Sequence, residues 1–202
     1  MSKHKLLGKT PDELKEMAVS CGLPIFAGGQ IAQWLYKKKV KTIDEMTNLS
    51  KAGREKLSEL YETGAVSYSD CHVSSDGTKK YLFPVTCSFK GGLYDIESED
   101  PGKTECSSIE AVMIPELDRK TLCVSSQAGC KMGCKFCMTG RQGFHGNLSA
   151  ADILSQYISV DEADSLTGTV FMGMGEPLDN FENVKRAIVI HRRAPDIEKI
   201  PG

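Results

Sequence analysis

The chain has 202 residues, of which 40% are hydrophobic and 26% charged, so it can bury a core and has the composition of a globular protein. The formal net charge of −2 indicates no particular class of partner. No stretch is long enough to span a membrane and the start lacks the apolar core of a signal peptide, so we expect a cytoplasmic protein with no membrane partner. In that compartment the eight cysteines should be mostly reduced.

The first part of the chain is predicted to be helical. The sequence Thr-Pro-Asp-Glu at residues 10–13 provides an N-cap, a proline at the first helical position and a capping-box glutamate. This helix is expected to end at Gly22, with the glycine pair at residues 28–29 preceding a second helix and Ser50 opening a third. Residues 1–64 are therefore predicted to form a small helical domain.

Strand signals follow this helical part. Residues 65–73 alternate loosely in polarity, the Asp-Gly pair at residues 76–77 predicts a hairpin turn, and residues 79–89 are typical of a strand. Gly, Asp, Glu and Ser dominate residues 90–108, which predicts a loop or an insertion. A β-hairpin with an insertion linker is thus expected over residues 65–104.

The remainder of the chain, residues 105–202, alternates between strands and helices. The expected strands are residues 109–114, 121–125 and 167–172, and the expected helices begin at the Ser149 cap and cover residues 181–191. Strands and helices that alternate in this way are the signature of a parallel α/β unit.

A cluster of three cysteines, Cys130, Cys134 and Cys137, has the spacing C-x3-C-x2-C. Three such thiolates can ligate three irons of a [4Fe–4S] cluster, and Gly133 allows the backbone to wrap around it. The fourth iron would be open to S-adenosylmethionine (SAM), whose S–C bond one electron can break to release a 5′-deoxyadenosyl radical. Zinc held by these thiolates and Cys123 is an alternative, although zinc sites usually pair two CxxC units.

The sequence around these cysteines resembles the RlmN/Cfr family, which comprises radical SAM methyltransferases that methylate an adenosine of 23S ribosomal RNA. The resemblance is carried by the runs CVSSQAGC at residues 123–130, CKFC at 134–137, QGF at 142–144, NL at 147–148 and FMGMGEPL at 171–178. It implies an α/β fold in which a helical accessory domain and a β-hairpin region precede part of a radical SAM (β/α) barrel. The implied cofactors are a [4Fe–4S] cluster and SAM.

The resemblance also implies roles for residues outside the cysteine cluster. Glu110 matches the family's proposed proton acceptor, and Cys123 matches the thiol that resolves a covalent RNA–protein intermediate through a transient disulfide. Gly175 and Glu176 would contact the amino-acid end of SAM, after a predicted strand whose carboxyl end is a usual place for a cofactor.

The residues themselves leave alternatives open for two of these positions. Strict alternation places Glu110 on one strand face with Val112 and Ile114, an apolar setting that can suit a base, but an edge-strand glutamate in water fits equally well. Cys123 has the alternative of a small buried hydrophobe. The lysine-rich run at residues 37–41 is compatible with RNA phosphate contact or with a solvated basic face.

The implied function is methylation of adenosine C2 through a methyl-cysteine intermediate. The implied partners are an RNA substrate, 23S rRNA with tRNA as a further candidate, and an electron-donor protein. The alternatives are C8 methylation, as in the Cfr branch, and a non-catalytic zinc-stabilised RNA-binding module. The chain supplies fewer strand–helix units than the family's barrel needs and has no cysteine after Cys137, so we expect an incomplete fragment that does not complete methyl transfer by itself.

Overall fold

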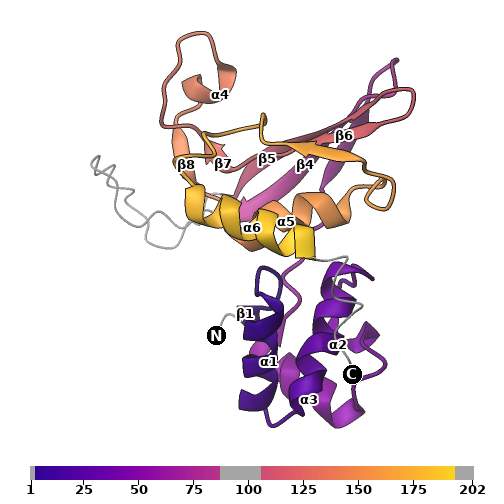
Figure 1. Cartoon of the computed structure of the whole chain (residues 1–202). Coiled ribbons are helices and arrows are strands. Elements are labelled where there is room, and N and C mark those ends of the chain that lie inside the picture. The colour runs from indigo at the N-terminus through magenta and orange to yellow at the C-terminus, as the bar shows by residue number, and fades with distance from the viewer. Residues whose placement is uncertain (1–2, 87–105, 194–202) are drawn as a thin grey trace. The chain divides into compact units, whose positions relative to one another are not determined.

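The computed structural model describes residues 3–86 and 106–193, so most of the insertion expected over residues 90–108 and the end of the strand before it lie outside the described residues. Residues 106–108 belong to a strand, so the prediction of a loop is wrong there. The chain folds as two compact units, which are described separately (Figure 1). The first consists of Met1–Ala65 and Lys185–Gly202, and the second of Val66–Val184. Within the described ranges no helix combines the length and apolar character that a membrane crossing requires.

The first unit is mainly helical, as expected. Its elements are β1 (His4–Lys5), α1 (Pro11–Ser20), α2 (Ile25–Tyr36), the short 3-10 helix η1 (Ile43–Glu45), α3 (Lys51–Leu60) and β2 (Tyr61–Glu62), the last pairing in parallel with β1. The predicted caps are confirmed. Thr10 N donates to Glu13 Oε2 at 2.7 Å and Glu13 N donates to Thr10 Oγ1 at 3.3 Å, while Ser50 Oγ accepts from Gly53 N.

The glycine pair at residues 28–29 does not precede the second helix, so that prediction is wrong. Helix α2 begins at Ile25 and contains both glycines. A Cβ atom at Gly28 would lie 2.4 Å from Lys15 Cα, so the backbones of α1 and α2 approach closely at this point. The glycine therefore serves helix packing, and the gain from that contact outweighs its low helix propensity.

Two further contacts of the first unit concern charged residues. Arg186, from helix α6 (Phe181–Arg193), pairs with Glu13 and donates from Nε to the carbonyl of Gly8 at 2.6 Å. The hydrogen bond from this guanidinium lowers the pKa of Glu13 to about 2. In the basic run, Lys38 Nζ lies 3.5 Å from the centre of the Trp34 ring, and RNA contact by residues 37–41 stays a prediction.

The second unit is built on a five-stranded sheet with the order β3-β4-β5-β6-β9. These strands are β3 (Asp70–Val73), β4 (Lys79–Thr86), β5 (Cys106–Pro115), β6 (Lys120–Cys123) and β9 (Gly168–Val170). The neighbours are antiparallel except for β6 and β9, which are parallel and are connected through α5 (Ala150–Ser159). The predicted hairpin turn and parallel α/β unit are thus both confirmed.

The sheet has one buried and one more open face. Phe83, Ile109, Ala111 and Leu122 are almost fully buried and alternate with more accessible residues. Helix α5 runs along the sheet in Figure 1 and contributes the buried side chains Ile153 and Leu154 to the core. Residues of the more open face are therefore available for purposes other than packing.

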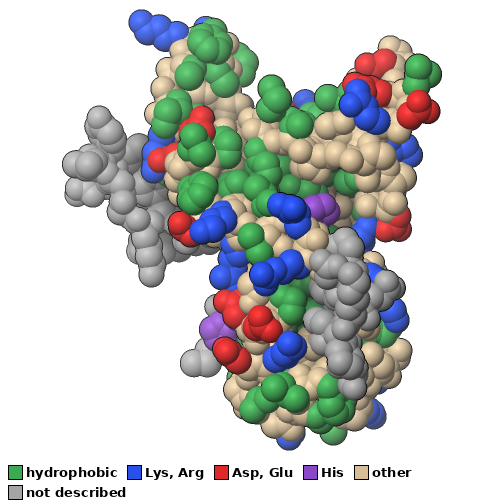
Figure 2. Space-filling model, viewed as in Figure 1, with side chains coloured by type: hydrophobic (Ala, Val, Ile, Leu, Met, Phe, Trp, Pro, Cys, Tyr) green, Lys and Arg blue, Asp and Glu red, His purple; other side chains and the backbone are tan. Residues whose placement is uncertain are grey.

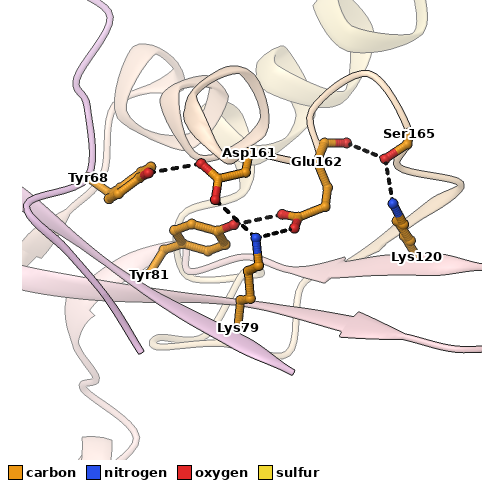
Figure 3. A network of polar contacts seen from close by, with 7 residues as sticks. All are labelled: Tyr68, Lys79, Tyr81, Lys120, Asp161, Glu162 and Ser165. Atoms are coloured by element: carbon orange, nitrogen blue, oxygen red, sulfur yellow. Dashed lines mark hydrogen bonds and ion pairs between the residues drawn. The ribbon is translucent and has the colours of Figure 1, made fainter. Parts of the chain in front are cut away.

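A network of polar contacts ties strand β4 to the loop between α5 and β9 (Figure 3). Lys79 Nζ lies 2.6 Å from Glu162 Oε1 and 3.0 Å from Asp161 Oδ2. Tyr81 donates its hydroxyl hydrogen to Glu162 Oε2 at 2.6 Å, and Tyr68 donates to Asp161 Oδ1 at 2.9 Å. Because β9 begins directly after this loop, the network fixes the amino end of that strand.

The same network sets the ionisation of its members. Burial raises the pKa of Glu162, but the hydrogen bonds from Lys79 and Tyr81 outweigh burial and hold that pKa below 4.5. Hydrogen bonds from Lys79 and Tyr68 lower the pKa of Asp161 below 3.8, and the two carboxylates raise the pKa of Lys79. The carboxylates therefore stabilise the fold fully above about pH 4.5, and this stabilisation is lost as the pH falls through their lowered pKa values.

We expect Lys79→Met to lower the melting temperature by about 2–5 °C at pH 7, because it leaves Glu162 poorly solvated and without its cation. The difference from the parent should shrink below about pH 4, where the carboxylates become protonated in both proteins. Thermal unfolding followed by circular dichroism at pH 7, 5 and 3 measures both effects. Lys120→Met is the matched control, since Lys120 Nζ reaches Ser165 Oγ and no carboxylate among the described residues. An equal loss in both variants would contradict the prediction.

Candidate functional site

The candidate site lies at the edge of the sheet where β6 and β9 end. Cys123 pairs with Val170 in the parallel register, so the two strands finish side by side. The segment after β6 leads into β7 (Gln127–Gly129), and the segment after β9 contains Gly173, Gly175 and Glu176. The carboxyl edge of parallel strands is the usual ligand-binding edge of α/β proteins.

Ser125 joins three segments at this edge. Its hydroxyl donates to the carbonyl of Glu110 at 2.6 Å and accepts from Met174 N at 2.8 Å. Its backbone is held by the amide of Gln156 on α5, which accepts from Ser125 N at 2.8 Å and donates to Ser125 O at 3.0 Å. Ser125 and Gln156 are both fully buried, so these bonds satisfy groups that would otherwise be costly to bury.

Gln127 forms the second group of buried contacts. Its Oε1 accepts from Glu176 N at 2.9 Å, and its Nε2 donates to Asn147 Oδ1 at 2.7 Å and to Asp179 Oδ2 at 2.6 Å. The side chain is fully buried and its amide makes all of these bonds to neighbouring segments. It therefore fixes the loop after β9 against the start of the cysteine-bearing segment.

Asn180 completes the set from the other end of the same loop. Its Nδ2 donates to the carbonyls of Ser126 at 2.7 Å and Leu148 at 2.8 Å, and its Oδ1 accepts from Asn183. Ser125, Gln127, Gln156 and Asn180, with their partners, are called the polar lock below. The polar lock holds residues 173–180 on residues 124–129.

Two glycines allow this close contact. A Cβ atom at Gly173 would lie 2.8 Å from the carbonyl carbon of Val124, and one at Gly175 would lie 2.5 Å from Gln127 Cβ. Gly175 also has φ +95°, a conformation that favours glycine. Glu176, its neighbour, accepts from Leu178 N through Oε1 at 3.0 Å. Gly173 and Gly175 therefore make room for residues 124–127 of the chain itself. From the sequence, we expect Gly175 to contact a ligand.

The cysteine loop lies between the two strands of a small antiparallel hairpin that the sequence did not predict, β7 and β8 (Phe144–Asn147). A Cβ atom at Gly129 would lie 1.9 Å from Gly143 O, so this crossing needs glycine, and Cys130 N donates to the same carbonyl at 2.9 Å. Within the loop, Arg141 at the end of the short helix α4 (Met138–Arg141) donates to the carbonyl of Lys135. Hydrogen bonds to the loop's own backbone carbonyls thus stabilise the cysteine loop.

The three thiols of this loop are accessible. Cys134 is exposed, while Cys130 and Cys137 are partly exposed. The N–H group of Gly140 hydrogen-bonds to the Cys137 sulfur and lowers the pKa of that thiol, which favours the thiolate needed for metal binding. Figure 2 shows hydrophobic side chains gathered near the tip of the cysteine loop, where Phe136 is 91% exposed.

The donor chemistry of the thiols fits an iron–sulfur cluster. Across residues 3–86 and 106–193, no three His, Cys, Asp or Glu side chains are close enough to hold one metal ion. Zinc needs all its thiolates at about 2.3 Å from one atom, whereas a [4Fe–4S] cluster takes each thiolate on a separate iron. Soft thiolate donors on one accessible loop therefore fit an iron–sulfur cluster in their chemistry.

Cys123 lies at the end of β6, half-buried, and burial raises the pKa of its thiol, with a smaller opposing effect from Met172 N–H. It stands directly opposite Val112 in the antiparallel register of β5 and β6. Directly opposed residues project to the same face, and Glu110 shares that face with Val112 because the side-chain period of a strand is two. The structure thus brings Glu110 and Cys123 to one face near the same edge.

Of the two settings that the sequence left open for Glu110, the structure shows the solvent-exposed one, although β5 lies between β4 and β6 and is not an edge strand. The buried side of β5 carries Ile109, Ala111 and Met113, so Glu110 projects from the more open side. Its side chain is 44% exposed, and its Oε1 lies 3.2 Å from Lys80 Nζ. The alternation was read correctly, but apolar neighbours along a strand do not reveal which face is covered.

Sequence reasoning gave no role to the residues that form the polar lock. Ser125 and Gln127 lie in the CVSSQAGC motif, and Gln156 and Asn180 lie in none of the motifs described above. Single buried amides have no spacing pattern, because their partners lie on other elements. A polar residue within an otherwise apolar helix face, as Gln156 is in α5, is the one local signal that was available.

The comparisons with known proteins agree with these observations. Residues 4–63 match the model of the ribosomal RNA large subunit methyltransferase N-terminal domain, and residues 124–201 match the radical SAM superfamily model. A "probable dual-specificity RNA methyltransferase RlmN" of Porphyromonas gingivalis is 52% identical over 92% of this chain and 48% of its own length. A "dual-specificity RNA methyltransferase RlmN" of a Marinomonas species is 38% identical over 94% of this chain and 49% of its own.

The chain combines an RlmN-type N-terminal domain with a radical SAM domain. It spans about half the length of the curated relatives it matches. The crystal structure of a radical SAM methyltransferase from Sphaerobacter thermophilus superposes with a TM-score of 0.77 and 32% identity, covering 93% of this chain and 51% of the other. The expected partial radical SAM α/β fold is thereby confirmed. The superfamily implies a [4Fe–4S] cluster and SAM as cofactors.

Asn180→Ala should reduce the free energy of unfolding of the second unit by about 2–3 kcal/mol, because two buried carbonyls lose a donor. Asn183→Ala is the matched control: among the described residues its amide donates only to Asn180 Oδ1, so its loss should cost less than about 1 kcal/mol. Urea unfolding followed by circular dichroism compares the two variants. Equal losses would show that the polar lock does not depend on Asn180.

Proposed function

We propose that the protein to which this chain belongs methylates C2 of an adenosine in 23S rRNA, and also acts on tRNA. The observation that carries the proposal is the placement of the cysteine loop on a hairpin that the polar lock fixes beside the edge with Cys123 and Glu110. The relatives' names, which describe dual-specificity RNA methyltransferases, support both substrates.

Two groups of residues would bind the cofactors. Cys130, Cys134 and Cys137 would hold the cluster through one thiolate each, and Gly175 and Glu176 would bind the amino-acid end of SAM. The cluster, once reduced, supplies the electron that releases a 5′-deoxyadenosyl radical from SAM. The backbone N–H of Glu176 is already held by Gln127, so the loop is oriented before any ligand contact.

Glu110 and Cys123 would act on the RNA after the carbon–carbon bond has formed. The Glu110 carboxylate, on the open face of the sheet, would accept the proton that leaves the adenine ring. The Cys123 thiolate would attack the cysteine sulfur that is linked to the RNA through the former methyl carbon, so that a transient disulfide forms as the carbon–sulfur bond breaks. The released carbon would take up a proton and become the methyl group of the RNA. Burial raises the pKa of the Cys123 thiol, so its attack would require removal of the thiol proton.

The remaining partners follow from this chemistry. Reduction of the cluster requires an electron-donor protein, and the exposed cysteine loop gives such a donor access to the site. Ribosomal RNA and reducing conditions are found together in the cytoplasm, where we place the reaction. C2 is preferred to C8 because the relatives that match carry the RlmN name.

Anaerobic reconstitution with iron and sulfide should give about four irons and four sulfides per chain, with the absorption and paramagnetic resonance of a [4Fe–4S] cluster. Cys134→Ala should abolish this signal, since each thiolate holds one iron. Cys21→Ala is the control, because Cys21 lies outside the cysteine loop on the first unit. One stoichiometric zinc per chain without a cluster would contradict the proposal.

Cells that express the full-length protein to which this chain belongs, in a strain without such an enzyme of its own, should contain 2-methyladenosine in 23S rRNA. Glu110→Gln should reduce that product at least tenfold, because the amide cannot accept the proton. Mass spectrometry of nucleosides from purified rRNA and tRNA measures both. Glu116→Gln is the matched control on the turn after β5, where its partner is Arg119. Finding 8-methyladenosine instead would overturn the assignment to C2.

A further inference from the structure

Asp179 occupies the junction between the polar lock and the cysteine loop. Its Oδ2 accepts from the buried Gln127 Nε2 at 2.6 Å and lies 3.1 Å from Lys131 Nζ. Lys131 is the residue after Cys130, so this ion pair begins inside the cysteine loop itself. Through this one oxygen atom, the loop after β9 contacts both Gln127, which precedes the cysteine loop, and Lys131, which lies within it.

Lys131 is held from a second side as well. Its Nζ lies 4.6 Å from the centre of the Phe144 ring on β8, in the geometry of a cation–π contact. The side chain is 47% exposed and that of Asp179 is 26% exposed, so the pair is partly shielded from water. Partial shielding from water and the hydrogen bond from Gln127 to the same carboxylate oxygen make the Lys131–Asp179 pair stronger than an isolated surface ion pair.

A continuous series of contacts therefore runs across the site. It starts at Glu176 N, which donates to Gln127 Oε1 at 2.9 Å, passes through the Gln127 amide to Asp179, and ends at Lys131. The other bonds of the polar lock hold residues 124–129, before the cysteine loop begins. Asp179 extends the connection to residue 131.

We propose that Asp179 is a positioning residue, which couples the cysteine loop to the loop that binds the amino-acid end of SAM. The inference rests on the proposed function, since it takes Glu176 as a SAM contact. When Lys131 and Asp179 are paired, ordering one loop lowers the entropy cost of ordering the other. Cluster binding at Cys130 and SAM binding at Glu176 are then mutually favourable.

A double-mutant cycle with Lys131→Met, Asp179→Asn and the double variant tests the coupling. In the cluster-loaded chain, each single variant should weaken SAM binding about three- to tenfold, and the double variant should be no weaker than the worse single one. Lys135→Met is the control in the same loop, because no ion pair of Lys135 is found in the described part of the chain. It should leave SAM affinity within about twofold of the parent.

Hydrogen exchange of the metal-free chain, followed by mass spectrometry, gives a readout independent of cofactors. Lys131→Met should speed exchange in residues 173–180 as well as in the cysteine loop, although the mutated residue belongs only to the latter. Exchange in residues 173–180 at the parent rate, or single effects on SAM affinity that multiply in the double variant, would overturn the proposal. Failure of the parent to form a cluster would overturn the proposed function, and the exchange result would still decide the role of Asp179.

Discussion

The polar lock is the constraint on which the site depends. It places fully buried amides and a hydroxyl between three segments, and each of these groups is satisfied by a partner from another segment. Moving any one segment would leave buried donors or acceptors without partners, which is costly in a low-dielectric interior. The glycines at residues 173 and 175 enforce the same geometry sterically, since a side chain at either would strike the facing backbone or Gln127.

The residues that stabilise the sheet and those proposed to take part in chemistry lie on opposite faces of it. Its covered face and the charged network around Lys79 hold the unit together, and that network lies at the amino end of β9. Glu110 and Cys123 stand on the other face, near the carboxyl edge of β6 and β9. A substitution in the Lys79 network should therefore change stability without changing the geometry of the site, whereas changes at the carboxyl edge affect both.

Much of the fold was predictable because its signals are local. Helix caps such as Thr10 and Ser50, the turn at residues 76–77 and the parallel strand–helix–strand unit each depend on residues close in sequence. The glycine pair at residues 28–29 misled the prediction, since their purpose is contact with another helix. The β7–β8 hairpin was missed because its strands are short and contain two glycines, which make them resemble a loop in sequence.

The motifs of the candidate site could be predicted from the sequence, but the buried polar contacts that hold the site together could not. The cysteines have a spacing that carries chemical meaning, while Gln156 and Asn180 acquire meaning only from partners 31 to 54 residues away. The setting of Glu110 stayed open in the sequence for a related reason. Alternation along a strand assigns residues to two faces, but the rest of the fold decides which face helices cover.

The β7–β8 hairpin has a consequence for how a cofactor would reach the protein. Its strand pairing, the crossing of Gly129 with Gly143 and the bond between Gln127 and Asn147 involve no thiol. The hairpin can therefore fold before its cysteines acquire any ligand, unlike small zinc domains, whose folding energy comes from the metal. Cofactor uptake is then a step separate from folding, because the thiols lie at the surface of a hairpin that has already formed.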